Sequence, residues 1–440
     1  MNRTVFGKWL LLSAFAAGAV LMAAPAAFAQ EITVSGEVKT GFYTEQETIG
    51  DDDPMAKGGA TNNDGESGSG TLVRLGFHLA YENMGLRVRF QIEPGVYALG
   101  MINPTWNYAF AYGNLFQEQF TVSAGLLGES PWGTGGHRIW SEPEAREYLG
   151  ANTLSGDPYI TSEGLWGVRF EIKPAAVPGL NVGFVLNQPD QVAEAAQDQT
   201  FGDVLGESAI GVAYEHDLFA ARVGYRFDSK ADKNGEGREE GARLVYRLEE
   251  RFIKNSIDGM QIWLNGDYYG IGSEQFEIQK NVGGQPVNIS MGSGEYFINW
   301  LYWLWDAPNF TANLDVCFGI HKTYNNPEFA QNGYAPAERQ EYQNLEVHPA
   351  FYYKFFDNLL QAGLGLGMGM EFGAGKTYKD SAYQFIYIEP LVRLNIGTNA
   401  YVAAVYTFTD QYAWFDESEI TRRGEKSVKH AVNIRAAYSF

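Results

Sequence analysis

The sequence has few cysteines, few basic residues relative to acidic ones, and no long apolar run after residue 30. It contains one cysteine, Cys317, so no internal disulfide can form. Lysine and arginine total 32 against 53 aspartate and glutamate, and a formal net charge of −21 disfavours nucleic acid as a partner. Beyond residue 30 no apolar run reaches the ~20 residues of a membrane-spanning helix, since even YFINWLYWLW (296–305) includes Asn299. These shortages exclude a disulfide scaffold and a helical membrane protein.

The first residues are typical of a secretory signal peptide. Arg3 and Lys8 precede the apolar run WLLLSAFAAGAVLMAA, and Ala27 and Ala29 form a small-residue cleavage site. The alternative is a membrane anchor, but the run is short and the small residues favour cleavage. We therefore expect residues 1–29 to be removed and residues 30–440 to form one domain.

Glycine and aromatic residues are abundant, with 51 Gly, 26 Tyr, 28 Phe and 10 Trp. Apolar residues recur at every second position, a period that predicts strands rather than helices. The alternating segments include TLVRLGFHLAY, GLRVRFQI, WNYAFAY, LWGVRFEI, LNVGFVL, FAARVGYRF, GARLVYRL, TANLDVCFGI, YIEPLVRLNI and the final HAVNIRAAYSF. Their lengths approach the ~10 residues with which a tilted strand crosses a membrane. The pattern predicts an all-β fold, a transmembrane antiparallel β-barrel of sixteen to eighteen strands.

The connections alternate between short and long. Tight joins are expected at ENMG, EHDL, DAPN, FDNL and GTN, whereas long polar stretches such as TEQETIGDDDPMAKGGATNNDGESGSG lie between them. This asymmetry indicates short periplasmic turns and long extracellular loops. Because every backbone polar group must be paired within lipid, the last strand should pair with the first.

Two chain ends and one loop resemble those of bacterial outer-membrane porins. The terminal Phe440 with Tyr438 before it resembles the C-terminal signature that the barrel-assembly machinery reads, and EITVSGEVKTGFY resembles a first porin strand. The long connection after the fifth strand contains SPWGTGG, similar to a P-x-x-G-G stretch in porin constriction loops. The resemblance implies passive diffusion of small hydrophilic solutes or ions across the outer membrane, contact with outer-membrane lipid, and a homotrimer.

Placing the alternating apolar residues toward lipid puts their neighbours in the lumen. A lipid-facing charge costs about 2–4 kcal/mol at mid-membrane, so the strand arginines are expected inside. The predicted pore-lining arginines are Arg74, Arg87, Arg89, Arg169, Arg222, Arg226, Arg243, Arg247, Arg393 and Arg435. They form either a basic wall that steers anionic solutes or simply a polar face, because lumenal Glu37, Glu171, Asp267, Asp315, Glu371 and Glu389 offset their charge.

The connection at about 129–162 is a candidate constriction loop. Its carboxylates are Glu129, Glu142, Glu144, Glu147 and Asp157. If it folds into the lumen, they face the arginines; alternatively the loop is an external, solvated flap. The apolar and flexible start of the loop favours insertion.

Two strands depart from simple alternation. LGLGMGMEFG puts Gly363, Gly365, Gly367 and Gly369 on the inner face, where glycine indicates either close approach of another group or relief of curvature. INWLYWLW is aromatic on both faces, which indicates either a subunit interface or membrane-interface aromatics.

No catalytic motif occurs, and we expect no enzyme activity, no cofactor and no metal site. The leading hypothesis is a porin for small hydrophilic solutes. The alternatives are a substrate-selective channel for sugars or anions, a surface adhesin or structural barrel that uses its acidic loops, and, more remotely, an outer-membrane lipid hydrolase.

Overall fold

The computed structural model describes residues 31–50, 53–61, 72–92, 104–127, 166–187, 205, 208–227, 240–271, 277–282, 285–290, 292–325, 340–372, 385–412 and 426–440. The predicted signal peptide, residues 1–29, lies outside these ranges. So does the predicted constriction loop, residues 129–162.

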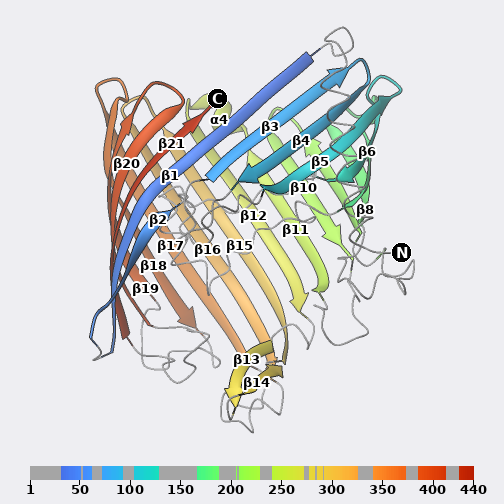
Figure 1. Ribbon diagram of the computed structural model, residues 1–440. Coiled ribbons are helices and arrows are strands. Elements are labelled where there is room, and N and C mark those ends of the chain that lie inside the picture. Colours follow the sequence, from blue (N-terminus) through green and yellow to red (C-terminus); the bar gives the residue numbers. More distant parts are fainter. Residues whose placement is uncertain are drawn as a thin grey trace.

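Eighteen strands close into an antiparallel barrel (Figure 1). They are β1 (Glu31–Ile49), β3 (Leu72–Tyr81), β4 (Met84–Ile92), β5 (Pro104–Leu115), β6 (Phe120–Leu126), β7 (Trp166–Ile172), β8 (Leu180–Asn187), β9 (Ala209–Glu215), β10 (Phe219–Arg226), β11 (Glu240–Glu250), β12 (Met260–Ile271), β15 (Gly292–Asp306), β16 (Phe310–Asn325), β17 (Gln340–Phe355), β18 (Leu360–Phe372), β19 (Phe385–Asn395), β20 (Ala400–Tyr412) and β21 (Lys426–Ser439). Each pairs with its neighbour in chain order, and β1 closes the ring by pairing with β21 and β3. The predicted barrel of sixteen to eighteen strands is confirmed.

Three further short strands accompany the eighteen of the barrel. β2 (Met55–Thr61) pairs with β1 from Gly41 to Glu47, beyond the part of β1 that pairs with β3. β13 (Glu277–Val282) and β14 (Gln285–Ser290) form a separate hairpin between β12 and β15. The stretch after residue 43 was expected to be a loop, and this part of the prediction was wrong. The polar side chains of this stretch suggested a loop. It is a strand because β1 pairs with β2 on one side and β21 on the other, and backbone pairing does not require apolar residues.

The connections at one end of the barrel, here called the short-turn end, are tight. They include the turns at 82–83, 116–119, 307–309, 356–359 and 396–399, and the short helix α4 (Phe252–Ser256). Both ends of the sheet lie there, because Phe440 exchanges two backbone hydrogen bonds of 2.9 Å with Gly36 near the start of β1. No described helix is long and apolar enough to cross a membrane.

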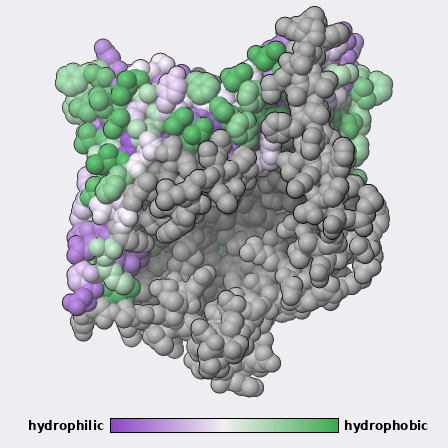
Figure 2. Space-filling view, in the orientation of Figure 1, coloured by the Kyte–Doolittle hydropathy of each residue, from purple (hydrophilic) through white to green (hydrophobic). Residues whose placement is uncertain are grey.

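The outer face of the barrel is apolar. Along β19, Ile388, Val392 and Leu394 are exposed while the alternate residues Tyr387, Glu389 and Leu391 are buried. The space-filling view shows hydrophobic side chains gathered on the outer surface toward the short-turn end (Figure 2). Because a closed sheet pairs the backbone of every strand, this apolar surface meets the requirements of a bilayer.

One strand reverses the predicted orientation. In β5 the register shifts between Arg89 and Phe90 of β4: Phe90 pairs with Trp106, but Arg89 pairs with Tyr108. The extra residue is Asn107, and such a bulge turns the following side chains to the other face. Trp106 remains outside, whereas Tyr108, Phe110 and Tyr112, expected toward lipid, share the inner face with the arginines of β4.

Candidate functional site

The candidate site is the inner wall of the barrel. Strand register places the predicted pore-lining arginines on one face of the sheet; for example, Arg74 pairs with Gln91, Arg87 with Phe110, and Arg222 with Arg247. The arginines with described side chains at inner positions are Arg74, Arg87, Arg89, Arg169, Arg222, Arg247, Arg393 and Arg435. Arg226 and Arg243 pair with each other in register. The loop carboxylates Glu129, Glu142, Glu144, Glu147 and Asp157 lie outside the described residues.

The Glu37 carboxylate of β1 forms ion pairs with cationic side chains of β1, β3 and β4. Glu37 Oε1 lies 2.8 Å from Arg74 Nη1 and 4.0 Å from Arg89 Nη2, and Glu37 Oε2 lies 3.6 Å from Lys39 Nζ. Arg74 also donates from Nε to Gln91 Oε1 at 2.6 Å. All four charged side chains are a quarter to a third exposed, so this group contacts solvent while carrying a net positive charge.

Two further arginines form cation–π contacts with aromatic residues of β5. The Arg87 guanidinium lies 5.7 Å from the centre of the Tyr112 ring, and that of Arg169 lies 5.5 Å from Phe110. Arg169 Nε is 2.9 Å from Glu171 Oε1. The sequence pattern missed these cation–π contacts, because they depend on the bulge at Asn107.

A network of ion pairs lies where β9, β10 and β11 approach the short-turn end. Glu215 is 3.3 Å from both Arg222 and Arg251. Glu249 is 3.6 Å from both Arg247 and Arg251. The arginines of this wall are therefore interleaved with carboxylates, and the wall is mixed in charge rather than purely basic.

The wall formed by β16, β17 and β19 carries buried acidic groups. Asp315 pairs in register with His348, and Cys317 with Glu346. The His348 ring nitrogens lie 3.0 Å from the Tyr387 hydroxyl and 3.4 Å from Glu346 Oε2. All five side chains are almost fully buried. Among the residues that the structure describes, no group of three acidic, histidine or cysteine side chains is arranged to hold a metal ion.

Inner glycines of β18 accommodate aromatic rings from the neighbouring strands. A Cβ on Gly367 would lie 1.9 Å from the Tyr387 ring, and a Cβ on Gly369 would lie 2.4 Å from the Phe385 ring. A Cβ on Gly363 would similarly lie 2.4 Å from the Tyr352 ring. Of the two explanations expected for these glycines, the structure supports close approach, by side chains of β17 and β19.

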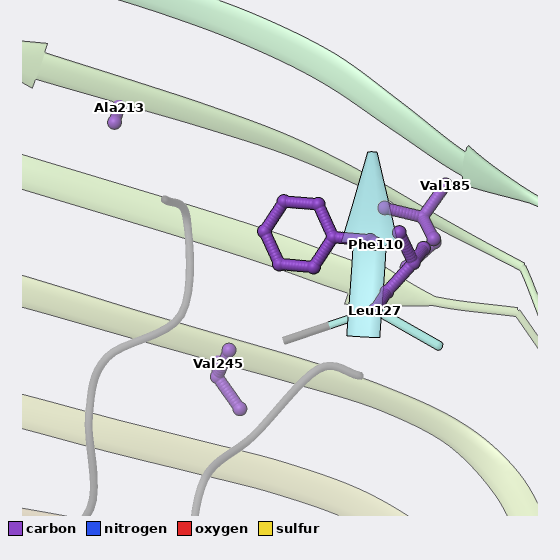
Figure 3. Packing of buried hydrophobic residues seen from close by; sticks show 6 residues of the cluster. Phe110, Leu127, Val185, Ala213 and Val245 are labelled. Atoms are coloured by element: carbon purple, nitrogen blue, oxygen red, sulfur yellow. The ribbon is translucent and has the colours of Figure 1, made fainter. Parts of the chain in front are cut away.

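The inner face also has an apolar section. Phe110, Leu127, Val185, Ala213 and Val245 belong to one buried cluster that extends along the wall from β5 to β11. Figure 3 shows the Phe110 ring beside Leu127 and Val185, with Ala213 and Val245 on further strands. Gly224 of β10 pairs in register with Gly211 on one side and with Val245 of the cluster on the other.

The two kinds of wall face each other. Around the ring of eighteen strands, β4 is nearly opposite β16 and β7 is nearly opposite β19, so the arginines of β4 face the carboxylates of β16 and β17, and Arg169 of β7 faces Glu389 of β19. Arg74 and Arg89 are partly exposed, whereas Arg169 and the carboxylates Asp315, Glu346 and Glu389 are buried.

Comparisons with known proteins give structural similarity only. No protein-family model matches the chain, and no curated protein sequence matches it. A loop-deletion variant of OmpT, an outer membrane protein of Vibrio cholerae, is similar over 93% of this chain and 99% of its own, with 13% identity and a TM-score of 0.49. The outer membrane channel DcaP of Acinetobacter baumannii covers 94% and 98%, with 11% identity and a TM-score of 0.48. An anion-selective porin from Comamonas acidovorans covers 93% and 99%, with 12% identity and a TM-score of 0.48.

Proposed function

We propose that this barrel is an outer-membrane channel through which small hydrophilic solutes and ions diffuse passively. The observation that carries the proposal is the closed ring of eighteen strands with an apolar outer face and charged residues along its inner face. Barrels of sixteen to eighteen strands are wide enough for an aqueous lumen. An ordinary soluble sheet protein has no need of an apolar outside around a charged inside.

The short-turn end is assigned to the periplasm. In bacterial outer-membrane barrels the periplasmic turns are short and the external loops are long. Residues 93–103 and 127–165, which connect β4 to β5 and β6 to β7, are long connections at the opposite end.

The inner wall supports selection of solutes by charge. The partly exposed arginines around Glu37 contact solvent, in a space bounded by low-dielectric walls that strengthen local fields. The group formed by Arg74, Arg89, Lys39 and Glu37 contains three positive charges and one negative charge. We expect a modest preference for anions in spite of the formal net charge of −21.

Single-channel recording tests the proposal. The chain, purified without residues 1–29 and refolded, is inserted in a planar bilayer with a salt gradient across it. We expect stable ohmic steps and a reversal potential whose sign indicates anion preference. A folded, heat-modifiable barrel that never conducts would overturn the channel and favour a surface role for the loops.

A sugar-selective channel is the second candidate function. Trp263 of β12 and Tyr302 of β15 stack on the inner face with ring centroids 3.9 Å apart, and Arg247 lies 5.0 Å from the Trp263 ring. Aromatic platforms of this kind suit the apolar faces of sugar rings. Maltooligosaccharides should then block the current transiently, and Trp263→Ala should abolish the block while leaving the open-channel conductance unchanged.

Three further assignments complete the proposal. Residues 1–29 act as a signal peptide, and residues 129–162 as a constriction loop whose deletion should raise conductance.

The last strand, with Tyr438 and Phe440 exposed on the outer face, is the segment that the barrel-assembly machinery reads. The barrels associate as homotrimers, which native mass spectrometry in mild detergent would detect.

A further inference from the structure

A pocket lies on the inner wall at the short-turn end, where β16, β17, β18 and β19 run side by side. Its volume is about 350 Å³, within the range of small-molecule sites. The register explains how it is assembled: Lys354 pairs with Gln361, and Gln361 pairs with Arg393. Asp306 and Thr311, next to the tight turn at 307–309, line its other side.

Arg393 is held in a fixed orientation in this pocket. Its guanidinium carbon lies over the Tyr401 ring, 3.8 Å from the centroid, and its Nε donates to Asn395 Oδ1 at 2.8 Å. Asn395 in turn donates to the backbone oxygen of Asn358 at 2.6 Å, which ties it to the turn between β17 and β18. Both terminal nitrogens of Arg393 therefore remain available as a planar pair of donors.

The charge of Arg393 is not neutralised within the described wall. Lys354 is matched, since its Nζ is 2.6 Å from Asp306 Oδ1 and 2.8 Å from the oxygen of Ala307. No described carboxylate lies within ion-pair distance of Arg393, whereas Arg74, Arg169, Arg222 and Arg247 all have one. The pocket thus contains two cations and one carboxylate, and one negative charge would balance it.

We propose that this pocket binds the carboxylate of a small polar solute at the periplasmic mouth of the lumen. The two terminal nitrogens of a guanidinium match the two oxygens of a carboxylate, and such paired bonds are among the stronger ones available. Gln361 donates from Nε2 to Asn358 Oδ1, and the Thr311 hydroxyl donates to Asp306 Oδ1, so the side-chain oxygens of both residues can accept hydrogen bonds from hydroxyl groups on the rest of the solute. The inference rests on the proposed channel only in that the solute reaches the pocket through the lumen.

Calorimetric titration of the refolded barrel in detergent tests the site directly. The probe is gluconate, with sorbitol as the uncharged counterpart and inorganic phosphate as the competing anion class, all at one low ionic strength. We expect weak, saturable gluconate binding and none of sorbitol. Arg393→Gln should weaken gluconate binding about tenfold or more, and Arg393→Lys should weaken it less, because charge remains while the paired donors are lost.

Arg87→Gln is the matched control, since Arg87 also lies over a tyrosine ring without a described carboxylate but on β4, which β20, β21, β1 and β3 separate from β19. It should bind gluconate as the wild type does. Absence of gluconate binding in the wild type, equal binding by Arg393→Gln, equal loss in Arg87→Gln, or Arg393-dependent binding of phosphate alone would each overturn the inference. Conductance recorded on the same preparations separates this result from the channel proposal: a conducting barrel that binds nothing disproves only the pocket.

Discussion

The ring of Phe440, the last residue, lies over the backbone of Gly36, near the start of β1. The two residues exchange backbone hydrogen bonds of 2.9 Å in both directions. A Cβ on Gly36 would lie 2.6 Å from Phe440 Cζ and 2.9 Å from the backbone oxygen of Arg74. The Phe440 ring therefore covers this glycine at the point where the sheet closes.

Substitution of Gly36 should therefore loosen the closing seam. We expect Gly36→Ala to lower the free energy of unfolding by about 1–3 kcal/mol through overpacking, measured by urea titration in lipid vesicles. Gly113→Ala on β5 is the control, because a Cβ there meets nothing within 4 Å. Equal effects at the two positions would contradict the contact.

A double-mutant cycle tests whether the Phe440 ring is the partner. Phe440→Ala alone should destabilise the barrel, since it uncovers Gly36 and removes an aromatic residue from the membrane interface. In that background Gly36→Ala should cost less than in the wild type, by about 0.5 kcal/mol or more. Strictly additive effects would indicate that the clash with the Arg74 oxygen dominates.

The inner glycines should be equally intolerant of side chains. In Gly367→Ala the new methyl group would displace the Tyr387 ring and break its hydrogen bond to His348, and we expect a loss of about 1–3 kcal/mol in the free energy of unfolding. Tyr387→Phe keeps the ring and removes only the hydroxyl, so it should cost about 0.5–1.5 kcal/mol. If Tyr387→Phe proved the more damaging, the hydrogen bond would matter more than the packing over glycine.

Neutralising Glu37 should increase anion preference. Glu37→Gln leaves Arg74, Arg89 and Lys39 without their shared carboxylate, so the reversal potential in a salt gradient should shift in the anion-selective direction. The shift should shrink at high salt because of screening. Glu31→Gln on the same strand, whose carboxylate forms no ion pair with the described cations, should shift it less. A shift toward cations would show that these arginines do not face the conducting path.

A polar pair on the outer face offers a test of lipid exposure. Tyr246 of β11 donates its hydroxyl proton to Asn299 Oδ1 of β15, across Gly266 of β12. Tyr246→Phe should destabilise the barrel by about 1–3 kcal/mol, because the Asn299 amide is left unpaired where no water replaces its partner. The double variant Tyr246→Phe with Asn299→Leu should recover most of the loss in the same urea titration. Failure to recover would mean that Asn299 has a further role, such as contact between barrels.

Much of the barrel follows from local patterns. Alternation in segments such as 72–81 and 387–396 fixes which residues meet lipid, because successive side chains of a strand point to opposite faces. The short turns and the number of strands follow from the spacing of these segments. The inner positions of Arg74, Arg169 and Arg393 are readable for the same reason.

The register between neighbouring strands cannot be predicted from the alternation within one strand. Asn107 becomes a bulge only when β5 meets β4, and that single extra residue moves Phe110 and Tyr112 from the lipid side to the lumen. Likewise, the glycine pattern indicated that a group approaches Gly367, but it could not identify that group as Tyr387, which becomes its neighbour only through the pairing of β18 with β19.

The sequence by itself determined the barrel, its number of strands within two, and the face on which each regular strand carries its charges. Only the tertiary structure decided that Glu37 is shared by three cations, that β2 lengthens the sheet beside β1, and that Arg393 keeps an unmatched charge in a pocket. The physical reason is that alternation is a property of one strand, whereas register, bulges and ion pairs are properties of two or more strands brought together by closure of the sheet.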